Sequence, residues 1–305
     1  MKIVQAEEFF YQKCNANNLA FQTLQYYKFA LENFNKFLEK VHITDIENVN
    51  TLNVYDYLTE IKEKYSPATY KGRFVAIKAF FNYCERAEII PVNPIKRMPL
   101  PKISRKIIYS FNKNEIQEIL AMFDKSKFIE LRNYTIICLL FGTGIRKSEL
   151  LGLTVGDLQA FDNTIKVYGK GNKERYIPIS DNLQRLLKRY INRRNKYIND
   201  NGKNNLPALF ITKDCRSLAV GGVNTLFNKI KNSKPVWSTR VSAHTWRHTF
   251  AKMFLLNGGD LFTLQKILGH EDISTTRIYL DLNNEELKVQ NEKFNPLDNT
   301  RWQYY

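Results

Sequence analysis

The chain has 305 residues, 44% of them hydrophobic and 13% aromatic, a composition typical of a globular protein whose length suits two domains. Its formal net charge of +16 favours an anionic partner, because such an excess repels itself unless a polyanion or an acidic surface neutralises it. No apolar run reaches membrane-spanning length and the N-terminus lacks a signal-peptide pattern, so we expect a cytoplasmic protein without membrane contact. The four cysteines form no CxxC pair, which predicts free thiols and neither disulfides nor a metal site.

The first part of the chain is predicted to be a bundle of helices. Between Asn18 and Lys40 the apolar residues recur at steps of three and four, which places one apolar stripe on a helix. Further helices are predicted over Thr51 to Glu63 and over Ser66 to Ala87, the latter with Ser66 as its N-cap and a proline in its first turn. Asn93-Pro94 ends this bundle, and we assign residues 1–97 to a helical domain.

Residues 98–110 contain two prolines and several basic residues without a helical stripe, which predicts a linker. The linker is either a plain surface connection or a segment that passes around a phosphate backbone. From residue 111 onward the pattern is mixed, and helices are predicted over Lys113 to Phe123, Leu131 to Phe141, Arg146 to Leu151, Asp181 to Tyr197, Gly222 to Lys231, Ala243 to Leu256 and Leu261 to Leu268.

Short β-branched and aromatic runs in this second part predict a small sheet. Asn163 to Tyr168 and Glu174 to Ile179 flank a glycine-containing turn and form a predicted antiparallel hairpin, and Leu209 to Thr212 is a candidate third strand. The expected fold is mainly α, with a helical first domain and an α+β second domain over residues 111–305. The basic excess lies in the second part, since residues 98–305 carry a net charge of +14 and residues 1–97 only +2.

Four segments of the second domain carry groups that phosphoryl transfer needs, and the first surrounds Arg146. Gly142 and Gly144 permit a tight approach before a helix whose first turn presents Arg146, and a guanidinium there can bond two phosphate oxygens at once. Glu149, one turn later, either orients a basic group or caps the helix.

The second segment is the hairpin turn around Lys170. A lysine at a glycine-flanked tip can be carried into a site and donate a proton to a departing alkoxide, although an isolated turn lysine is usually only solvated. Lys173 and Arg175 beside it are candidate phosphate ligands.

The third and fourth segments lie near the end of the chain. His244 and Arg247 are three residues apart on one face of a helix that Ser242 is placed to cap. Leu268-Gly269-His270 ends the next helix, and Tyr279 follows nine residues after His270. A lone histidine or tyrosine is usually structural, so the order and spacing of the whole set carry the prediction.

In that order the residues resemble the catalytic domain of the tyrosine recombinases, also called the phage integrase family, which carries Arg, Lys, His-x-x-Arg, His or Trp, and Tyr. The matching positions are Arg146, Lys170, His244, Arg247, His270 and Tyr279. The first domain is similar to the core-binding domain of Xer-like and transposon-borne members at residues 66–70 (Ser-Pro-Ala-Thr-Tyr) and at Asn93-Pro94. The resemblance implies the two-domain type: a core-binding domain over residues 1–97, a linker over 98–110 and a catalytic domain over 111–305.

The resemblance also implies a site-specific recombinase that needs no cofactor. Tyr279 would attack the scissile phosphate to give a 3′-phosphotyrosine and a free 5′-hydroxyl, and the 5′-hydroxyl of a second strand would reverse the step. Arg146 and Arg247 would hold the non-bridging oxygens with His270 as a further donor, His244 is the candidate base and Lys170 the candidate acid.

The implied partner is double-stranded DNA with paired recombination sites, held by a tetramer because recombination needs four cleavages. Candidate DNA contacts are Lys71, Arg73, Lys78, Lys173 and Arg175. Residues 283–294 are expected to be helical and to pack either on a neighbouring protomer or on their own domain. The task is either integration or excision of a mobile element, or Xer-like resolution; the alternatives from other classes are a non-catalytic DNA-binding regulator of the same fold and a type IB topoisomerase.

Overall fold

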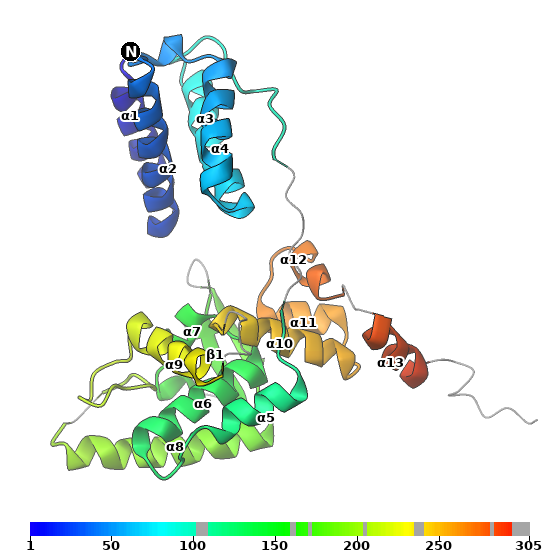
Figure 1. Cartoon of the computed structure of the whole chain (residues 1–305). Helices are drawn as coiled ribbons and strands as arrows, with labels where there is room; N and C mark the ends of the chain where they lie inside the picture. The colour runs from blue at the N-terminus through cyan, green and yellow to red at the C-terminus, as the bar shows by residue number, and fades with distance from the viewer. Residues whose placement is uncertain are drawn as a thin grey trace, which may run out of the picture. The chain divides into compact units, whose positions relative to one another are not determined.

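The structure of the protein is a computed structural model that describes residues 1–101, 109–158, 163–169, 173–203, 206–234, 241–280 and 284–294, of which residues 284–287 and 289 are described by their backbone alone. Its contacts divide the chain into two units, Met1–Lys106 and Ile107–Tyr305 (Figure 1). Among the described helices none is long and apolar enough to cross a membrane.

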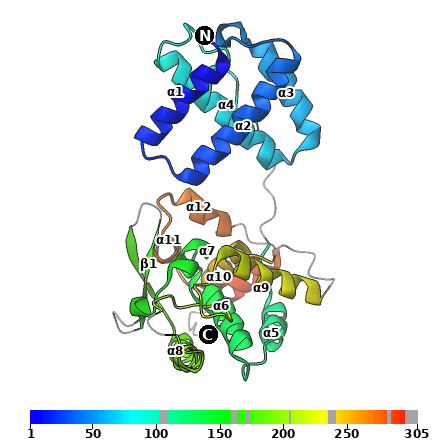
Figure 2. The same ribbon diagram turned by 90° about the vertical axis from the view of Figure 1, so that its left-hand side faces the viewer.

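The first unit is a bundle of four helices, α1 (Ile3–Ala16), α2 (Phe21–Lys40), α3 (Thr51–Lys64) and α4 (Pro67–Arg86) (Figure 2). α4 contacts the other three helices and buries Phe74, Phe80 and Phe81 among them. The helices predicted over α2, α3 and α4 are confirmed. Ser66 caps α4 as expected, since its side chain accepts a hydrogen bond from the backbone N–H of Thr69 at 3.3 Å.

The second unit is built around α6 (Phe128–Thr143), whose buried residues lie on all sides of the helix, as expected of a helix that is apolar all round. α8 (Asp181–Asp200) and α10 (Ala243–Leu256) both pack against α6. α5 (Lys113–Ala121) and α9 (Val220–Ser233) add Ile119 and Phe227 to the same core. The helices predicted for this part are confirmed, with ends that differ from the prediction by a few residues.

The sheet of the second unit is the predicted antiparallel hairpin of β1 (Thr164–Tyr168) and β2 (Glu174–Pro178), in which the buried Ile165 and Ile177 lie opposite each other. The prediction of a third strand over Leu209 to Thr212 is wrong. That segment divides its backbone hydrogen bonds between different neighbours, because Leu209 N–H donates to Leu153 C=O and Ile211 forms a single bridge with Ser217, so no continuous ladder forms.

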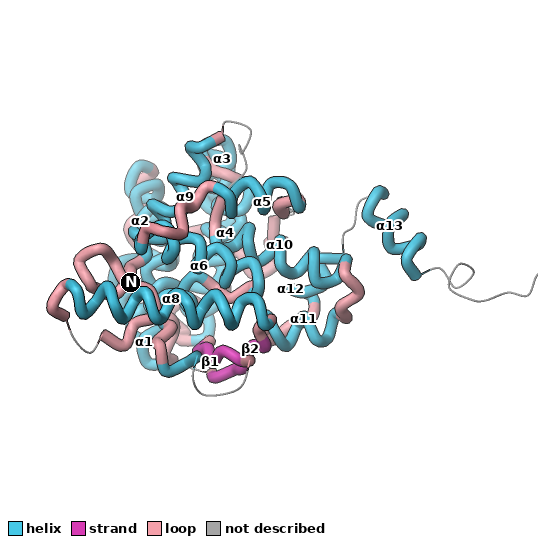
Figure 3. Tube along the Cα trace, turned by 90° about the horizontal axis from the view of Figure 1, so that it is seen from below, coloured by secondary structure: helices cyan, strands magenta, loops and turns pink. Residues whose placement is uncertain are grey.

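Short elements follow α10 in the chain. α11 (Leu261–Leu268) lies beside β2 (Figure 3), and α12 (Ser274–Arg277), which the sequence did not predict, leads into a 3₁₀ turn over Ile278–Leu280. The helix expected near the end of the chain is α13 (Asn284–Phe294). Gln290 Nε2 donates to the C=O of Leu256 at 2.8 Å, so α13 contacts the end of α10 in its own chain, one of the two arrangements expected.

Candidate active site

The side chains predicted to be catalytic come from the ends of several elements of the second unit. Arg146 stands immediately before α7 (Lys147–Gly152), and His244 and Arg247 lie in the first turns of α10. His270 follows the end of α11, and Tyr279 lies in the 3₁₀ turn. Hydrogen bonds, ring contacts and a shared pocket bring these five side chains together, whereas Lys170 lies outside the described residues.

Arg247 is the centre of this cluster and is only 3% exposed. Its guanidinium donates to the C=O of Gly144 and to the C=O of Leu268, each at 2.7 Å, and so joins the C-terminal ends of α6 and α11, where helix dipoles favour a positive charge. Burial, followed by the nearby charge of Arg146, lowers the pKa of Arg247 to about 10. The side chain therefore stays positively charged at neutral pH.

The close approach at the end of α6 depends on Gly144. This residue has a φ of +62°, the left-handed conformation that glycine adopts without strain. A Cβ atom at this position would lie 2.5 Å from Phe250 Cδ1. The glycine thus allows α6 to stop against α10 and presents its C=O to Arg247.

Arg146 is held by a buried carboxylate. Glu149, whose side chain is 1% exposed, accepts hydrogen bonds from the backbone N–H and the Nη1 of Arg146 and from both terminal nitrogens of Arg175. Burial alone would raise the pKa of Glu149, but the hydrogen bonds and charges of Arg175 and Arg146 outweigh it and lower the pKa to about 2. Of the two predicted alternatives for Glu149, the structure shows both, because the carboxylate caps α7 and orients two arginines.

Arg146 also donates to the C=O of Gly269 at 3.1 Å, while Arg175 donates to the C=O of Ile267. These bonds connect the start of α7 and strand β2 to the end of α11. A Cβ atom on Gly269 would lie 3.0 Å from the Arg175 side chain, so the glycine leaves room for this close approach. The side chain of Arg146 remains 38% exposed and can still contact a ligand.

His270 has both ring nitrogens engaged. Its Nε2 lies 2.8 Å from Arg247 Nη2 and its Nδ1 lies 2.8 Å from Thr276 Oγ1. Because a guanidinium only donates, Nε2 accepts from Arg247, and Nδ1 carries the proton and donates to Thr276. Burial, with the charges of Arg247 and Arg146, lowers the pKa of His270 to about 4, so the ring is neutral at pH 7.

Tyr279 is 5% exposed and packs among Ala251, Leu264 and Leu268. Burial raises the pKa of its phenol, and the charge and hydrogen bond of Arg247 act in the opposite direction. The phenol is therefore protonated at neutral pH and lies against a permanent cation. A reaction that uses its oxygen as a nucleophile needs a group that accepts this proton.

His248 is a member of the cluster that the sequence did not single out. Its ring lies 4.1 Å from that of His244 and 5.2 Å from that of Tyr279, between centroids. Its buried Nδ1 has no hydrogen-bond partner among the described residues, and burial lowers its pKa to about 4. The spacing of four residues after His244, which places both rings on one face of α10, was the signal available in the sequence.

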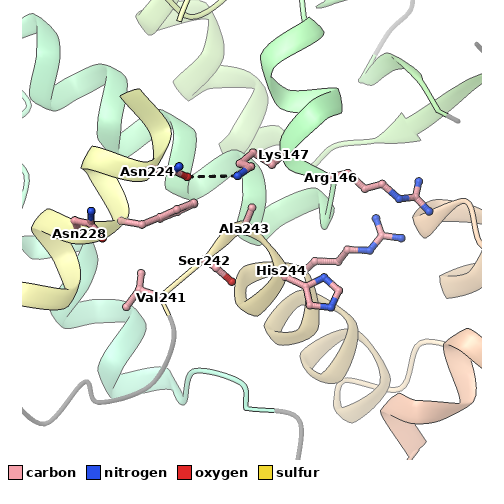
Figure 4. Close-up of a pocket in the computed structure, with 10 residues that line it drawn as sticks. Arg146, Lys147, Asn224, Asn228, Val241, Ser242, Ala243 and His244 are labelled. Carbon is pink, nitrogen blue, oxygen red and sulfur yellow. Dashed lines mark hydrogen bonds between the residues drawn. The ribbon is translucent and has the colours of Figure 1, made fainter. Parts of the chain in front are cut away.

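A pocket of about 430 Å³ opens beside the cluster. Figure 4 shows Arg146 before α7 and His244 on α10 at this pocket, with Lys147 turned toward Asn224 of α9, to which it donates at 3.3 Å. Ser242 caps α10 as predicted, since it accepts from the N–H of Thr245. Burial, then the charge of Arg247, lowers the pKa of His244, so its ring is neutral at pH 7 and able to accept a proton.

The predicted DNA contacts fall into two groups. On α4, Lys71 is partly exposed and Lys78 donates to the C=O of Met98, but Arg73 is 2% exposed and lies over the ring of Tyr65 at 3.8 Å. Arg73 is therefore part of the core of the first unit in this structure, which removes it from the groups that present a free guanidinium to DNA.

Near the cluster, Lys173 is exposed and forms an ion pair with Glu271 at 2.7 Å. Arg175 is only 15% exposed and bound to Glu149, so it supports Arg146 from within the protein. Among the described residues, no group of histidine, cysteine and acidic side chains has an arrangement that could hold a metal ion.

Comparison with known proteins identifies the family of the chain. The family model described as "Phage integrase family" matches residues 110–286, and that described as "Phage integrase, N-terminal SAM-like domain" matches residues 7–88. The chain belongs to the phage integrase family.

The chain is 30% identical to tyrosine recombinase XerC of Anoxybacillus flavithermus over 272 residues, 89% of this chain and 90% of that protein. It is 30% identical to tyrosine recombinase XerD of Oceanobacillus iheyensis over 293 residues, 95% of this chain and 97% of that protein. It is thus a tyrosine recombinase, an enzyme of site-specific recombination.

Solved structures share the fold. A XerH site-specific recombinase bound to a palindromic difH substrate in a post-cleavage complex superposes with a TM-score of 0.75 at 23% identity, covering 91% of this chain and 81% of that one. The Tn1549 transposon integrase in complex with transposon right end DNA superposes with a TM-score of 0.72 at 21% identity, covering 96% and 99%.

Proposed function

We propose that this enzyme cleaves and rejoins double-stranded DNA through a covalent bond between Tyr279 and a 3′-phosphate. The observation that carries the proposal is the position of the Tyr279 phenol against the buried cation Arg247, in a cluster that also holds Arg146 and neutral histidines. A phosphate placed there would meet both arginines. The negative charge that develops on its non-bridging oxygens is the charge that fixed cations stabilise best.

In the proposed reaction the Tyr279 oxygen forms a bond to phosphorus as the bond to the 5′-oxygen breaks. The phenol proton passes to His244, whose lowered pKa leaves it neutral and able to accept at pH 7. The departing 5′-oxygen takes a proton from Lys170, a role that the family resemblance assigns to it. Attack by the 5′-hydroxyl of a second strand reverses these steps, so the phosphodiester bonds are exchanged without a net loss of bond energy.

The remaining members of the cluster hold the two arginines in place. Glu149 and Arg175 orient Arg146, and His270 accepts from Arg247 through Nε2. While that bond persists His270 cannot donate to a phosphate, because Nε2 carries no proton. Donation by His270 would therefore require Arg247 to leave Nε2 when the phosphate binds. The ring of His248 packs against the rings of both His244 and Tyr279 and helps to position them.

The proposed partner is DNA carrying paired recombination sites, bound by a tetramer. Solved relatives in complex with difH substrate and with transposon end DNA support a DNA partner. The first unit would serve as the core-binding domain, with Lys71 as a candidate contact, and Lys173 would contact phosphate near the active site. Similarity to XerC and XerD supports Xer-like resolution, and similarity to the transposon integrase supports action on a mobile element.

Capture of covalent protein–DNA adducts tests the role of Tyr279 and does not require the target sequence to be known. The protein is incubated with sheared genomic DNA of its source, the mixture is denatured in detergent, and the DNA that stays bound to protein is sequenced. We expect the wild type to yield enriched fragments that share one sequence and Tyr279→Phe to yield none. Tyr197→Phe, which removes a hydroxyl on α8, is the matched control and should retain the adduct.

The recovered sequence then separates the competing functions. Two plasmid copies of it should recombine with the wild-type protein. Binding of the site without any adduct would instead indicate a non-catalytic regulator, and relaxation of supercoils without exchange between two sites would indicate a topoisomerase. An undiminished adduct with Tyr279→Phe would assign the nucleophile to another residue.

A further inference from the structure

The outer face of α8 is a strip of basic side chains that the proposed reaction does not use. Its exposed residues include Arg185, Lys188, Arg189, Arg193 and Lys196, and no acidic residue occurs from Asn182 to Asn199. We call these five side chains the α8 strip. Over five turns of helix the exposed residues are otherwise mostly asparagine.

The charges of the α8 strip are not neutralised within the part of the chain that the structure describes. Elsewhere an exposed helix pairs its lysines with acids, as in Lys36 with Glu32 and Lys64 with Glu60, both one turn apart. No ion pair with an acidic side chain is found for the α8 strip among the described residues. Like charges at spacings of three and four residues destabilise a helix by about 0.2–0.5 kcal/mol per pair, so the α8 strip lowers the stability of the helix unless an anionic partner binds it.

The α8 strip faces away from the active site. The buried side of α8 packs on α6, and α6 packs on α10, which carries His244 and Arg247. In Figures 1 and 2 α8 lies on the side of the second unit opposite α12. Two successive helix contacts of about 8–10 Å each separate the axes of α8 and α10 by up to about 20 Å. A duplex bound at Tyr279 is therefore not the anion that the strip meets.

We infer that the α8 strip binds the phosphate backbone of a second DNA segment, separate from the duplex held at Tyr279. This inference rests on the proposed function only in assigning that first duplex to the active site. Arg185, Arg189 and Arg193 recur about every 6 Å along a strip roughly 16 Å long, a linear array that suits a duplex with one charge per about 1.7 Å of axis.

The chemistry of the strip favours DNA over an acidic protein. Arginine bonds phosphate through two nitrogens, and the neighbouring asparagines are also phosphate donors. None of the large hydrophobic side chains exposed in the described structure lies on α8, whereas the centre of a protein interface is normally apolar and aromatic. Charge alone, without an apolar anchor, is typical of sequence-independent binding to a backbone.

Capture of a second duplex tests the inference in the full-length protein. Two 40-bp duplexes of unrelated random sequence are used, one attached to beads and one fluorescent, in the Tyr279→Phe background so that neither is cut. The triple variant Arg185→Gln, Arg189→Gln, Arg193→Gln should retain at least ten-fold less fluorescent duplex than the parent at 0.1 M salt. A plot of the logarithm of retention against the logarithm of salt concentration should become less steep by about 2.7, because each of the three lost phosphate contacts contributes about 0.9 to its slope.

The control variant Lys229→Gln, Lys234→Gln removes two positive charges from ion-paired sites of the second unit, as many as Lys188→Gln with Lys196→Gln, and should retain the second duplex within two-fold. Lys188→Gln with Lys196→Gln should lower the salt dependence by about 1.8, which keeps the test valid if the triple variant does not fold. Glutamine is as good a helix former as arginine or lysine, so α8 should persist.

Equal retention by the parent and both strip variants would overturn the inference. The inference would also be overturned if the strip variants lost binding to a polyglutamate probe but captured DNA as the parent does, since the partner would then be an acidic polypeptide. With Tyr279 intact, the strip variants should form the covalent adduct within two-fold of wild type, and a loss of adduct equal to the loss of capture would place the strip on the cleaved duplex. Absence of adduct in the wild type would instead refute the proposed function.

Discussion

Replacement of Glu149 by glutamine tests the network that holds Arg146. The carboxylate is 1% exposed and accepts from Arg146 and Arg175. Glu149→Gln would keep the size of the side chain but remove its charge and turn one oxygen into an N–H group that faces a guanidinium. Arg175, only 15% exposed, would lose its counter-charge.

The expected loss of stability in Glu149→Gln follows from the pKa of Glu149 in the folded protein. A value of about 2 in the folded protein against an ordinary 4.5 corresponds to a stabilisation of about 3 kcal/mol at neutral pH. Removing one partner from a buried pair costs a similar amount, roughly 3–5 kcal/mol. Because the folded pKa is depressed, this stabilisation is present above pH 4.5 and is lost as the pH falls toward 2. The difference between wild type and variant should therefore shrink by about half between pH 5 and pH 3.

Tryptophan fluorescence during urea unfolding measures this loss of stability in the intact protein, because Trp246 is fully buried in the core of the second unit. Glu118→Gln is the control, since Glu118 pairs with Lys234 at the surface, where both side chains are 48% exposed, and should cost less than about 1 kcal/mol. The reasoning fails if Glu149→Gln destabilises no more than Glu118→Gln at pH 7, or if the difference does not decrease in acid.

Three further predictions concern single residues. Burial lowers the pKa of His248 to about 4 from an ordinary 6.5, so as the pH falls the unfolded chain binds a proton at this residue before the folded protein does. Between pH 7 and pH 5 the free energy of unfolding in urea should therefore decrease by about 2 kcal/mol more for the wild type than for His248→Asn. An equal decrease for the two proteins would show that the pKa of His248 is not lowered in the folded protein. Gly144→Ala should lower the stability by about 2–4 kcal/mol, because residue 144 has a positive φ and a Cβ atom there would contact Phe250. Gly152→Ala is the control and should change the stability by less than about 1 kcal/mol, since its Cβ atom would meet nothing within 4 Å. Equal urea midpoints for the two variants would contradict this prediction. Ser66→Ala should destabilise α4 by about 1 kcal/mol and accelerate hydrogen exchange of the Thr69 amide, and unchanged exchange would show that the cap is dispensable.

Local patterns in the sequence were enough to predict most helices and the hairpin. The apolar stripe of α2, the Ser66 cap and the glycine-containing turn between β1 and β2 each act within a few residues, so their outcome depends little on the rest of the chain. α12 escaped prediction because a four-residue helix carries no periodic signal. The third strand was predicted wrongly because strand pairing depends on distant partners, and the residues around Leu209 found several different ones.

The sequence by itself determined which reactive groups the protein carries and in what order, and this order was sufficient to predict a tyrosine recombinase. Only the tertiary structure decided what each group touches. Arg247 meets the C=O of Gly144 and the ring of His270, and no local pattern encodes contacts over such separations. Likewise Arg73 proved to be buried, because whether a side chain on a helix faces a neighbour or solvent is decided by how the helices pack.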